Sequence, residues 1–172
     1  SDTVPPHWGA NFWKDREAPV HVELNDGITS LFSADMGAKN HGYAGRFNDQ
    51  KPLDIQTSSP FGDGDISGVL FAEKPAREFK KLLLRNGSQD WKNTLLRDPM
   101  GSLLALRSGI DAQGYRPVRV YVNSTYWGLY QLREKSEESF IASNYSINED
   151  AVEMIGALGR PLQGSSAEWN VS

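Results

Sequence analysis

Alternating hydrophobic and polar positions mark the first predicted strand of the chain. In the run PVHVEL, residues 19–24, every second side chain is valine or leucine, and histidine and glutamate lie between them. This period of two is typical of a strand that buries one face. The sequence Asn-Asp-Gly at residues 25–27 follows directly and predicts a turn, because these residue types adopt the backbone angles that turns require.

Later segments extend the pattern of short strands. A glycine-punctuated stretch from Gly37 to Gly45, followed by Lys51 to Ile55, indicates two short strands around a loop. The apolar run from Phe79 to Leu84 fits a helix or a buried strand by periodicity alone, and the Asn-Gly pair soon after it favours a short strand. The polar stretch at residues 58–68 is typical of an exposed loop.

A hairpin is predicted in the second half of the chain. Residues 117–122 and 126–132 are both rich in β-branched and aromatic side chains, which favour strands. The intervening Asn-Ser-Thr, residues 123–125, is short enough to form a tight turn. We therefore expect the two segments to pair as antiparallel strands.

One longer helix is predicted between the apolar run and the hairpin. Asp90 or Asn93 is placed to cap a helix that runs to about Arg107. Pro99 falls inside this segment, where proline removes a hydrogen bond and clashes with the preceding turn. The helix therefore either kinks at the proline or begins near Asp98.

These elements together predict an α+β fold, an antiparallel sheet with a few packed helices. A second, shorter helix is expected from residue 136 or 137 to about residue 145. The paired prolines near the start indicate an irregular arm over residues 1–11, and residues 12–172 then form one domain.

Composition excludes several classes of protein. The net charge of -4 and the isoelectric point of about 5.4 give no support to a nucleic-acid partner. The absence of cysteine excludes a disulfide framework and a thiolate zinc site. No run of about 18 apolar residues occurs, so no transmembrane segment is expected. The chain opens at Ser1 without a targeting segment, which indicates a processed or excised piece of a longer protein.

Sequence motifs for common chemistries are missing or incomplete. Neither a phosphate-binding P-loop nor a Gly-x-Gly-x-x-Gly turn occurs, and no Gly-x-Ser-x-Gly element points to a serine nucleophile. Residues 63–68 match the opening of a calcium loop, but Lys74 stands where a bidentate glutamate is required, which favours a surface turn. The three histidines lack the spacing of a zinc site, so no metal ligands are predicted.

Two groups of side chains leave alternatives open. The aromatic residues of the hairpin could stack on sugars or bases, although core packing is the favoured account of half of them: Tyr121, Tyr126, Trp127 and Tyr130. The basic residues around the apolar run favour a solvated face over an anion site, because Glu78 and Asp90 lie among them: Lys80, Lys81, Arg85 and Lys92.

Several motifs follow one another in the order in which one known family carries them. They are FKKLLLRNGSQDW at residues 79–91, TLLRD at 94–98, RPVRVYVNSTYWGLYQLREK at 116–135 and, upstream, FWKDREAPVHVEL at 12–24 and NHGYAGRFNDQKPLDI at 40–55. These segments resemble the CotH family, the spore coat protein H-like atypical protein kinases. The resemblance covers roughly residues 12–169 and implies the small lobe of such a kinase, truncated before the catalytic lobe.

The resemblance also implies candidate nucleotide-binding residues. Lys51 would occupy the strand position at which kinases neutralise nucleotide phosphates, with a surface lysine as the alternative. The helix at residues 93–107 would correspond to the kinase helix whose glutamate pairs with that lysine. It contains no glutamate, and its only acid is Asp98, which could equally cap the helix or pair with Arg97.

The end of the hairpin supplies the last candidate. Residues 128–132 lead into Glu134 and resemble the strand that enters the kinase hinge, where backbone groups meet an adenine ring. Glu134 is therefore a candidate site residue, and the alternative is an exposed partner of Arg133 or Lys135. Lys51, Arg97, Asp98 and Glu134 are thus the predicted nucleotide-binding set.

The function that the resemblance implies is transfer of phosphate from ATP, with Mg²⁺, to hydroxyl groups of a coat or cell-surface protein. The catalytic acids are expected beyond residue 172, so this chain alone should not catalyse the transfer. The location implied is outside the bacterial cytoplasm, at the cell surface or spore coat. The alternative is a noncatalytic extracellular module that binds or adheres through its aromatic hairpin.

Overall fold

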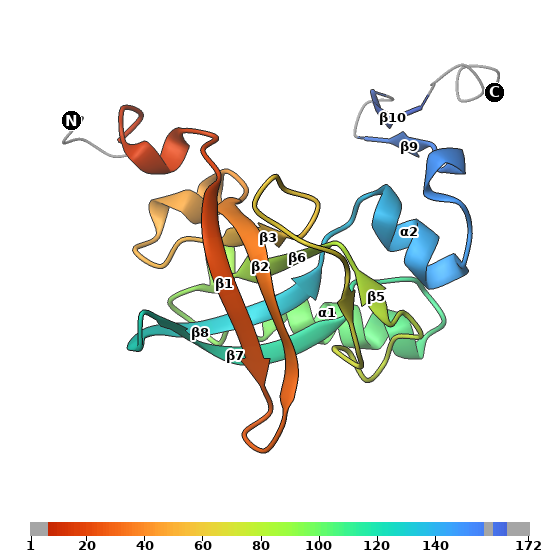
Figure 1. Cartoon of the computed structure of the whole chain (residues 1–172), viewed down its shortest axis with the longest axis horizontal. Coiled ribbons are helices and arrows are strands. Elements are labelled where there is room, and N and C mark those ends of the chain that lie inside the picture. Colours follow the sequence, from red (N-terminus) through yellow and green to blue (C-terminus); the bar gives the residue numbers. More distant parts are fainter. Residues whose placement is uncertain (1–6, 157–159, 165–172) are drawn as a thin grey trace.

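The computed structural model describes residues 7–156 and 160–164. Its main feature is a curled, antiparallel sheet with the strand order β1-β2-β3-β6-β8-β7 (Figure 1). These strands are β1 (Ala18–Asn25), β2 (Ser30–Asn40), β3 (Leu53–Gln56), β6 (Lys81–Arg85), β7 (Tyr115–Val122) and β8 (Thr125–Glu134).

Short elements surround this sheet. Two small antiparallel ladders pair β4 (Ile66–Ser67) with β5 (Glu78–Phe79) and β9 (Met154–Ile155) with β10 (Pro161–Gln163). The helices are α1 (Arg97–Arg107), α2 (Glu138–Tyr145) and the short 3-10 helices Asn11–Trp13, Ala44–Phe47, Ser88–Asp90 and Glu149–Ala151. The predicted α+β class is confirmed. Among the described residues, no helix has the length and apolar character needed to cross a membrane.

The first predicted strand and turn are confirmed. Along β1 every second residue is partly buried from Val20 onward, and β1 pairs with β2 to form the long hairpin in Figure 1. The Asp26 carboxylate accepts hydrogen bonds from the backbone N–H groups of Ile28 and Thr29, at 2.9 and 2.8 Å, which fixes the turn.

The segments between this hairpin and α1 differ from their predicted bounds. β2 begins well before Gly37, and β3 begins at Leu53 rather than Lys51. Pro52 explains the later start, because it has no N–H to donate to a ladder. The run from Phe79 to Leu84 is extended as predicted, but Lys80 divides it into β5 and β6.

The hairpin of β7 and β8 is confirmed with a tighter turn than predicted. Val122 pairs with Thr125, so only Asn123 and Ser124 form the loop. Both have positive φ angles, 49° and 65°, as the two-residue hairpin turn that matches strand twist requires.

Helix α1 resolves the question raised by Pro99. The helix begins at Arg97, so the proline lies in the first turn, where its missing N–H would have no partner inside the helix. The Asp90 carboxylate accepts a hydrogen bond from the Arg97 N–H at 3.3 Å and thereby caps the helix from outside. Of the two alternatives, a helix that begins near Asp98 is correct.

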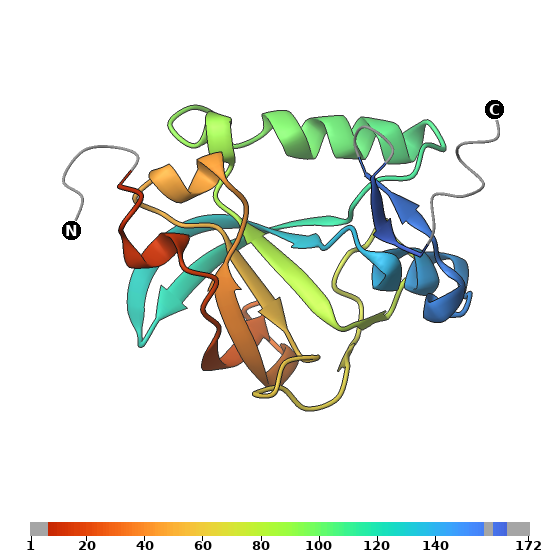
Figure 2. The ribbon, with the colours of Figure 1, turned by 90° about the horizontal axis from the view of Figure 1, so that it is seen from above.

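The hydrophobic core covers one face of the main sheet. Met36, Ile55, Leu82 and Leu132 point from successive strands into this core and are at most 4% exposed. The side of the core that faces away from the sheet is covered by residues of the segment that contains β4 and β5: Ile66, Leu70, Phe71, Ala76 and Phe79. Figure 2 shows α1 on the opposite side of the sheet from this segment. Side chains alternate along a strand, so the residues between the core positions point toward the α1 side.

Candidate functional site

Charged side chains occupy the α1 side of the central strands. Lys39, Asp54, Leu83 and Arg133 are neighbours across β2, β3, β6 and β8, and they lie between the core positions of those strands. Two residues along from them, Lys81 and Arg85 lie at the two ends of β6 and Lys135 directly follows β8. We call this set the charged face: Lys39, Asp54, Lys81, Arg85, Arg133 and Lys135.

Ion pairs link part of the charged face into one chain. His41 Nδ1 lies 3.0 Å from Asp54 Oδ1, and Lys135 Nζ lies 3.1 Å from Asp54 Oδ2. Lys135 also contacts Glu137 at 2.5 Å, and Lys81 contacts the other oxygen of Glu137 at 2.6 Å. This network therefore joins His41, directly after β2, to Lys81 at the start of β6 through alternating carboxylate and ammonium groups.

In this network of ion pairs, burial and neighbouring charges shift the pKa values of the buried groups in opposite directions. Burial opposes ionisation of Asp54, but the hydrogen bonds and charges of His41 and Lys135 outweigh it and lower the pKa of Asp54. Burial also opposes the charge of Lys135, yet Glu137 and Asp54 raise its pKa. Glu137 behaves like Asp54, because Lys135 and Lys81 lower its pKa against the effect of burial.

Asp98 joins α1 to the sheet. Its carboxylate contacts the guanidinium of Arg133 on β8, and Oδ2 lies 3.8 Å from Nε of Arg85 on β6. Arg133 is 1% exposed and donates further hydrogen bonds to Ser102 Oγ at 2.6 Å and to the Gly114 carbonyl at 3.1 Å. The acid of the helix is therefore paired with bases of two central strands.

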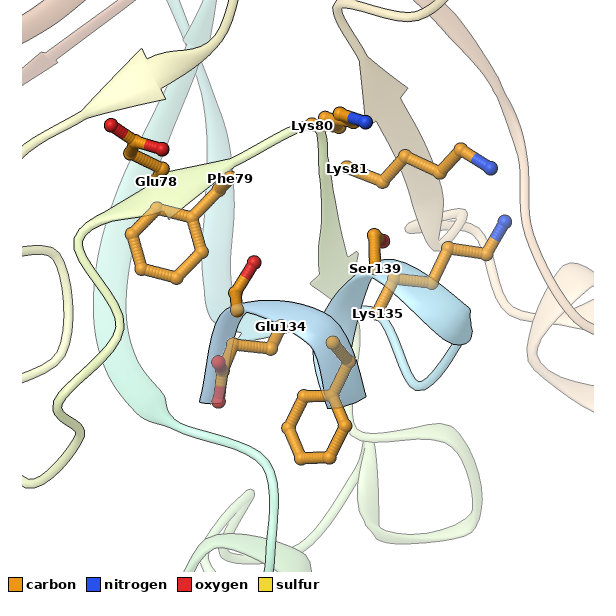
Figure 3. A pocket seen from close by; sticks show the side chains of 9 residues that line it. Glu78, Phe79, Lys80, Lys81, Glu134, Lys135 and Ser139 are labelled. Atoms are coloured by element: carbon orange, nitrogen blue, oxygen red, sulfur yellow. The ribbon is translucent and has the colours of Figure 1, made fainter. Parts of the chain in front are cut away.

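Glu134 lies on the other side of the sheet from these bases. It is 2% exposed, and its carboxylate accepts hydrogen bonds from the Gly114 N–H at 2.6 Å and from Asn144 Nδ2 at 2.9 Å. Lys74 Nζ lies 3.8 Å away. Burial raises the pKa of Glu134, and these partners reduce that rise. Figure 3 shows Lys81 and Lys135 extending to one side and Glu134 turned to another.

The hollow in Figure 3 is small. It lies between β5, β6 and α2 and is lined by Glu78, Phe79, Lys80, Lys81, Glu134, Lys135, Ser139, Phe140 and Ser143. Its volume of about 10 Å³ accommodates no more than about one water molecule. A nucleotide base does not fit inside it, so any base would have to bind over its mouth.

The remaining predicted residues lie apart from the charged face. Lys51 precedes β3, donates to the Asn48 carbonyl at 2.5 Å and lies over the Phe12 ring at 4.5 Å. Within residues 7–156 and 160–164, no acidic side chain forms an ion pair with Lys51. The Arg97 side chain is 74% exposed and lies 3.9 Å from Asp90. Among the predicted set, only Asp98 contacts the charged face, and the nucleotide-binding roles of all four residues stay predictions.

Sequence reasoning missed most of the charged face. The signal was present, because Leu-Asp-Ile-Gln in β3 and Leu-Arg-Glu-Lys at the end of β8 place charges at alternate positions of strands. Charged residues in central strands are rare unless they are paired. Pairing depends on neighbouring strands, however, and the strand order was not known from the sequence.

Metal ligands do not cluster in the part of the chain that the structure describes. No group of three or more histidine, aspartate or glutamate side chains there could hold a metal ion. The charged face instead combines cations with isolated carboxylates. Its chemistry suits a bound anion better than a bound metal.

Comparison with known proteins identifies the family. The family model described as CotH kinase protein matches residues 38–165, which include β3, β6, α1, the β7–β8 hairpin and α2. No curated protein matches the chain. The match covers most of the sequence and agrees with the motifs at residues 40–55, 79–98 and 116–135. The chain therefore belongs to the CotH kinase protein family.

Proposed function

We propose that this chain is part of an ATP-dependent protein kinase, and that its charged face binds the phosphates of the nucleotide. The parent protein would transfer phosphate to hydroxyl groups of a protein substrate at the cell surface or spore coat. Family membership supports the reaction class. The observation that carries the proposal is the pairing of Asp98 on α1 with Arg85 and Arg133 on the sheet.

This pairing matters because of how kinases position phosphates. Catalysis of phosphoryl transfer depends mainly on placing charges, and protein kinases pair a basic residue of a strand with an acid of the neighbouring helix. Here the acid is an aspartate and the bases are arginines, so the reach and geometry of the pair differ from a lysine–glutamate bridge. The helix has no glutamate for the ordinary bridge, and this pair is the candidate replacement.

The cations beside this pair are suited to a polyphosphate. The side chains of Lys39, Lys81 and Lys135 are 28%, 24% and 17% exposed, so each ammonium group is partly shielded from water and partly accessible. Shielding strengthens the interaction with an anion. Glu137 holds two of these lysines, and a phosphate group would replace it as their partner.

The described residues fit the phosphates of ATP but not its Mg²⁺. They offer cations on one face and no cluster of carboxylates. In this proposal the acids that bind Mg²⁺ and the catalytic base lie beyond residue 172, and the described chain contributes binding. ATP should therefore bind to the chain without phosphate transfer.

A side-by-side comparison of two lysines tests the proposal. In the full-length protein, transfer of radiolabelled phosphate from ATP should fall at least tenfold in Lys81→Met, because Lys81 belongs to the charged face. Lys51→Ala tests the position predicted from the resemblance, and Lys14→Met is a matched control on an exposed segment. Normal transfer in Lys81→Met with an intact fold would contradict the proposed phosphate site, and a loss confined to Lys51→Ala would move that site to Lys51.

A specific observation favours the second candidate function, a noncatalytic binding module. At the tip of the β7–β8 hairpin, Tyr121, Tyr126 and Trp127 are 56%, 53% and 51% exposed, while Tyr130 is buried. Exposed rings provide flat apolar surfaces on which sugars can stack. The open reading frame separates the two functions: kinase-like Asp and Asn residues downstream favour the enzyme, whereas a stop near Ser172 favours the module.

A further inference from the structure

A second pocket lies between the entrance of α1 and the β7–β8 hairpin. Its volume is about 160 Å³, and its lining comes from β6, β7, β8 and the loop before α1: Arg85, Asn86, Thr94, Leu95, Leu96, Tyr115, Pro117, Leu129, Tyr130 and Gln131. We call it the entry pocket. A cavity of roughly 150 Å³ can hold one benzene molecule, so the entry pocket has room for a single ring.

Most of the pocket wall is apolar. Tyr115 and Pro117 contribute from β7 and Leu129 from β8, while Leu95 and Leu96 contribute from the loop before α1. Leu96 and Leu129 are each 49% exposed, so the pocket opens to solvent between them. A flat or branched apolar group would bury these side chains and gain the hydrophobic free energy that they now lack.

Two polar groups lie side by side in this apolar lining. Arg85 and Gln131 are direct partners in the β6–β8 ladder, which places their Cβ atoms about 5 Å apart. Gln131 is 3% exposed, and its Nε2 donates to the Leu95 carbonyl, which fixes the orientation of the amide. Its Oε1 is buried and accepts no hydrogen bond from any described residue. A buried acceptor without a donor is unfavourable, because it has lost its hydrogen bonds to water and gained none from the protein.

Arg85 has capacity for an anion. Its ion pair with Asp98 is long, 3.8 Å from Nε to Oδ2, because the same carboxylate is held more closely by Arg133. The Arg85 side chain is 32% exposed. A guanidinium group can bind a carboxylate through two parallel hydrogen bonds, and Arg85 is the cation that lines the entry pocket.

From these groups we infer that the entry pocket binds a small carboxylic acid that carries one apolar ring or branched chain and a hydrogen-bond donor on the carbon next to the carboxylate. The carboxylate pairs with Arg85, the adjacent hydroxyl or amino group donates to Gln131 Oε1, and the apolar group contacts Tyr115 and Leu129. Gln131 Oε1 then has the donor that it lacks in the free chain, and Arg85 has a closer anionic partner than Asp98.

Ligands that differ by one group test this chemistry. Isothermal titration of the chain, without nucleotide, should give binding of mandelate or phenylglycine at least threefold tighter than that of phenylacetate, which lacks the donor. Benzyl alcohol, which lacks the carboxylate, should bind at least tenfold more weakly than mandelate. Preference for mandelate or for phenylglycine identifies the donor as a hydroxyl or an ammonium group. Equal binding of phenylacetate, or no saturable binding of any of these compounds, would overturn the inference.

Variants assign the polar contacts to their residues. Arg85→Met should weaken mandelate binding at least tenfold, whereas Arg107→Met, the same change at an exposed position of α1, should not. Gln131→Met should make mandelate and phenylacetate equal. Leu129→Trp should block the pocket while Arg85 stays in place, and thermal unfolding checks that each variant folds. Unchanged binding in folded Arg85→Met or Leu129→Trp would show that the ligand binds elsewhere, whatever the outcome for nucleotide binding.

Discussion

The two faces of the main sheet are built from the same strands and differ in almost every physical property. One face is mainly apolar, with the buried pair of Glu134 and Lys74 at the end of β8, and it is closed by Phe71 and its neighbours. The other is charged, covered in part by α1, and held by ion pairs. The apolar face accounts for most of the stability, because burial of apolar area is the main favourable term in folding. Burial of charged groups is unfavourable, and the proposed phosphate binding would account for their presence on the charged face.

The largest effect should come from the apolar face. Phe71 is fully buried and packs edge-to-face on Phe79 with ring centroids 5.5 Å apart. Phe71→Ala should lower the free energy of unfolding by about 3–5 kcal/mol, because it removes apolar contacts and leaves a cavity. Chemical denaturation measures this change. Phe61→Ala is the control, because Phe61 is 43% exposed, and its free energy of unfolding should fall far less. Similar losses in both variants would contradict the position of the core.

The charged face should respond to loss of its buried cation. Arg133→Met should lower the free energy of unfolding by about 2–3 kcal/mol, less than the full 3–5 kcal/mol for breaking a buried pair, because Asp98 remains 42% exposed to water. Arg97→Met, at an arginine that is 74% exposed, should cost less than about 0.5 kcal/mol. Equal losses of unfolding free energy in the two variants, measured by chemical denaturation, would show that the link between α1 and the sheet does not stabilise the fold.

The two carboxylates on opposite faces should respond to pH with opposite signs. The pKa of Asp54 is lowered below 3.8, so its contribution to stability is present above about pH 4 and is lost as the pH falls. The pKa of Glu134 is raised above 4.5, so its contribution is present below about pH 4.5 and is lost as the pH rises through the folded-state value.

Thermal unfolding from pH 3 to pH 8 checks these signs. The stability difference between wild type and Asp54→Asn should shrink as the pH falls below about 4. Relative to Glu134→Gln, the wild type should lose stability as the pH rises above about 4.5. The same pH trend in both variants would mean that the two faces do not shift their acids in opposite directions.

The smallest effect should come from the hairpin turn, which lies outside both faces. Ser124 adopts a φ of 65°, which glycine tolerates better than serine. Ser124→Gly should therefore raise the free energy of unfolding by about 0.5–1 kcal/mol. Ser108→Gly is the control, because Ser108 has a φ of -89° and gains nothing from glycine. Destabilisation by Ser124→Gly would contradict the turn geometry.

Local patterns predicted most elements of the fold. The alternation in β1, the turn at Asp26 and the β7–β8 hairpin are decided by residues close together in the sequence, and all were confirmed. The two prolines in this part of the chain were recognised as disruptive, but the exact starts of the neighbouring helix and strand were not predicted. Pro99 left two positions for the start of α1, and Pro52 moved the start of β3 away from Lys51.

The candidate site was harder to predict, because its residues meet only across strands. Asp98 was identified as the acid of the helix, but its partners are Arg85 and Arg133 rather than Lys51. Nothing within the helix sequence indicates that the nearest bases belong to β6 and β8. Glu134 was predicted at the end of the second hairpin strand, and it is the last residue of β8. Because side chains alternate along a strand, its carboxylate points toward Lys74 and Gly114 and away from the charged face.

Motifs and local patterns of residues were sufficient to predict the family, the α+β class and the strands whose alternation is local. Which charges meet depended on how the strands are arranged in space. This arrangement placed Asp54 beside Lys135, Asp98 beside Arg133, and Gln131 beside Arg85 in the entry pocket. The physical reason is range: backbone preference and periodicity act within a few residues, whereas ion pairing depends on strand order and register, which join residues far apart in the chain.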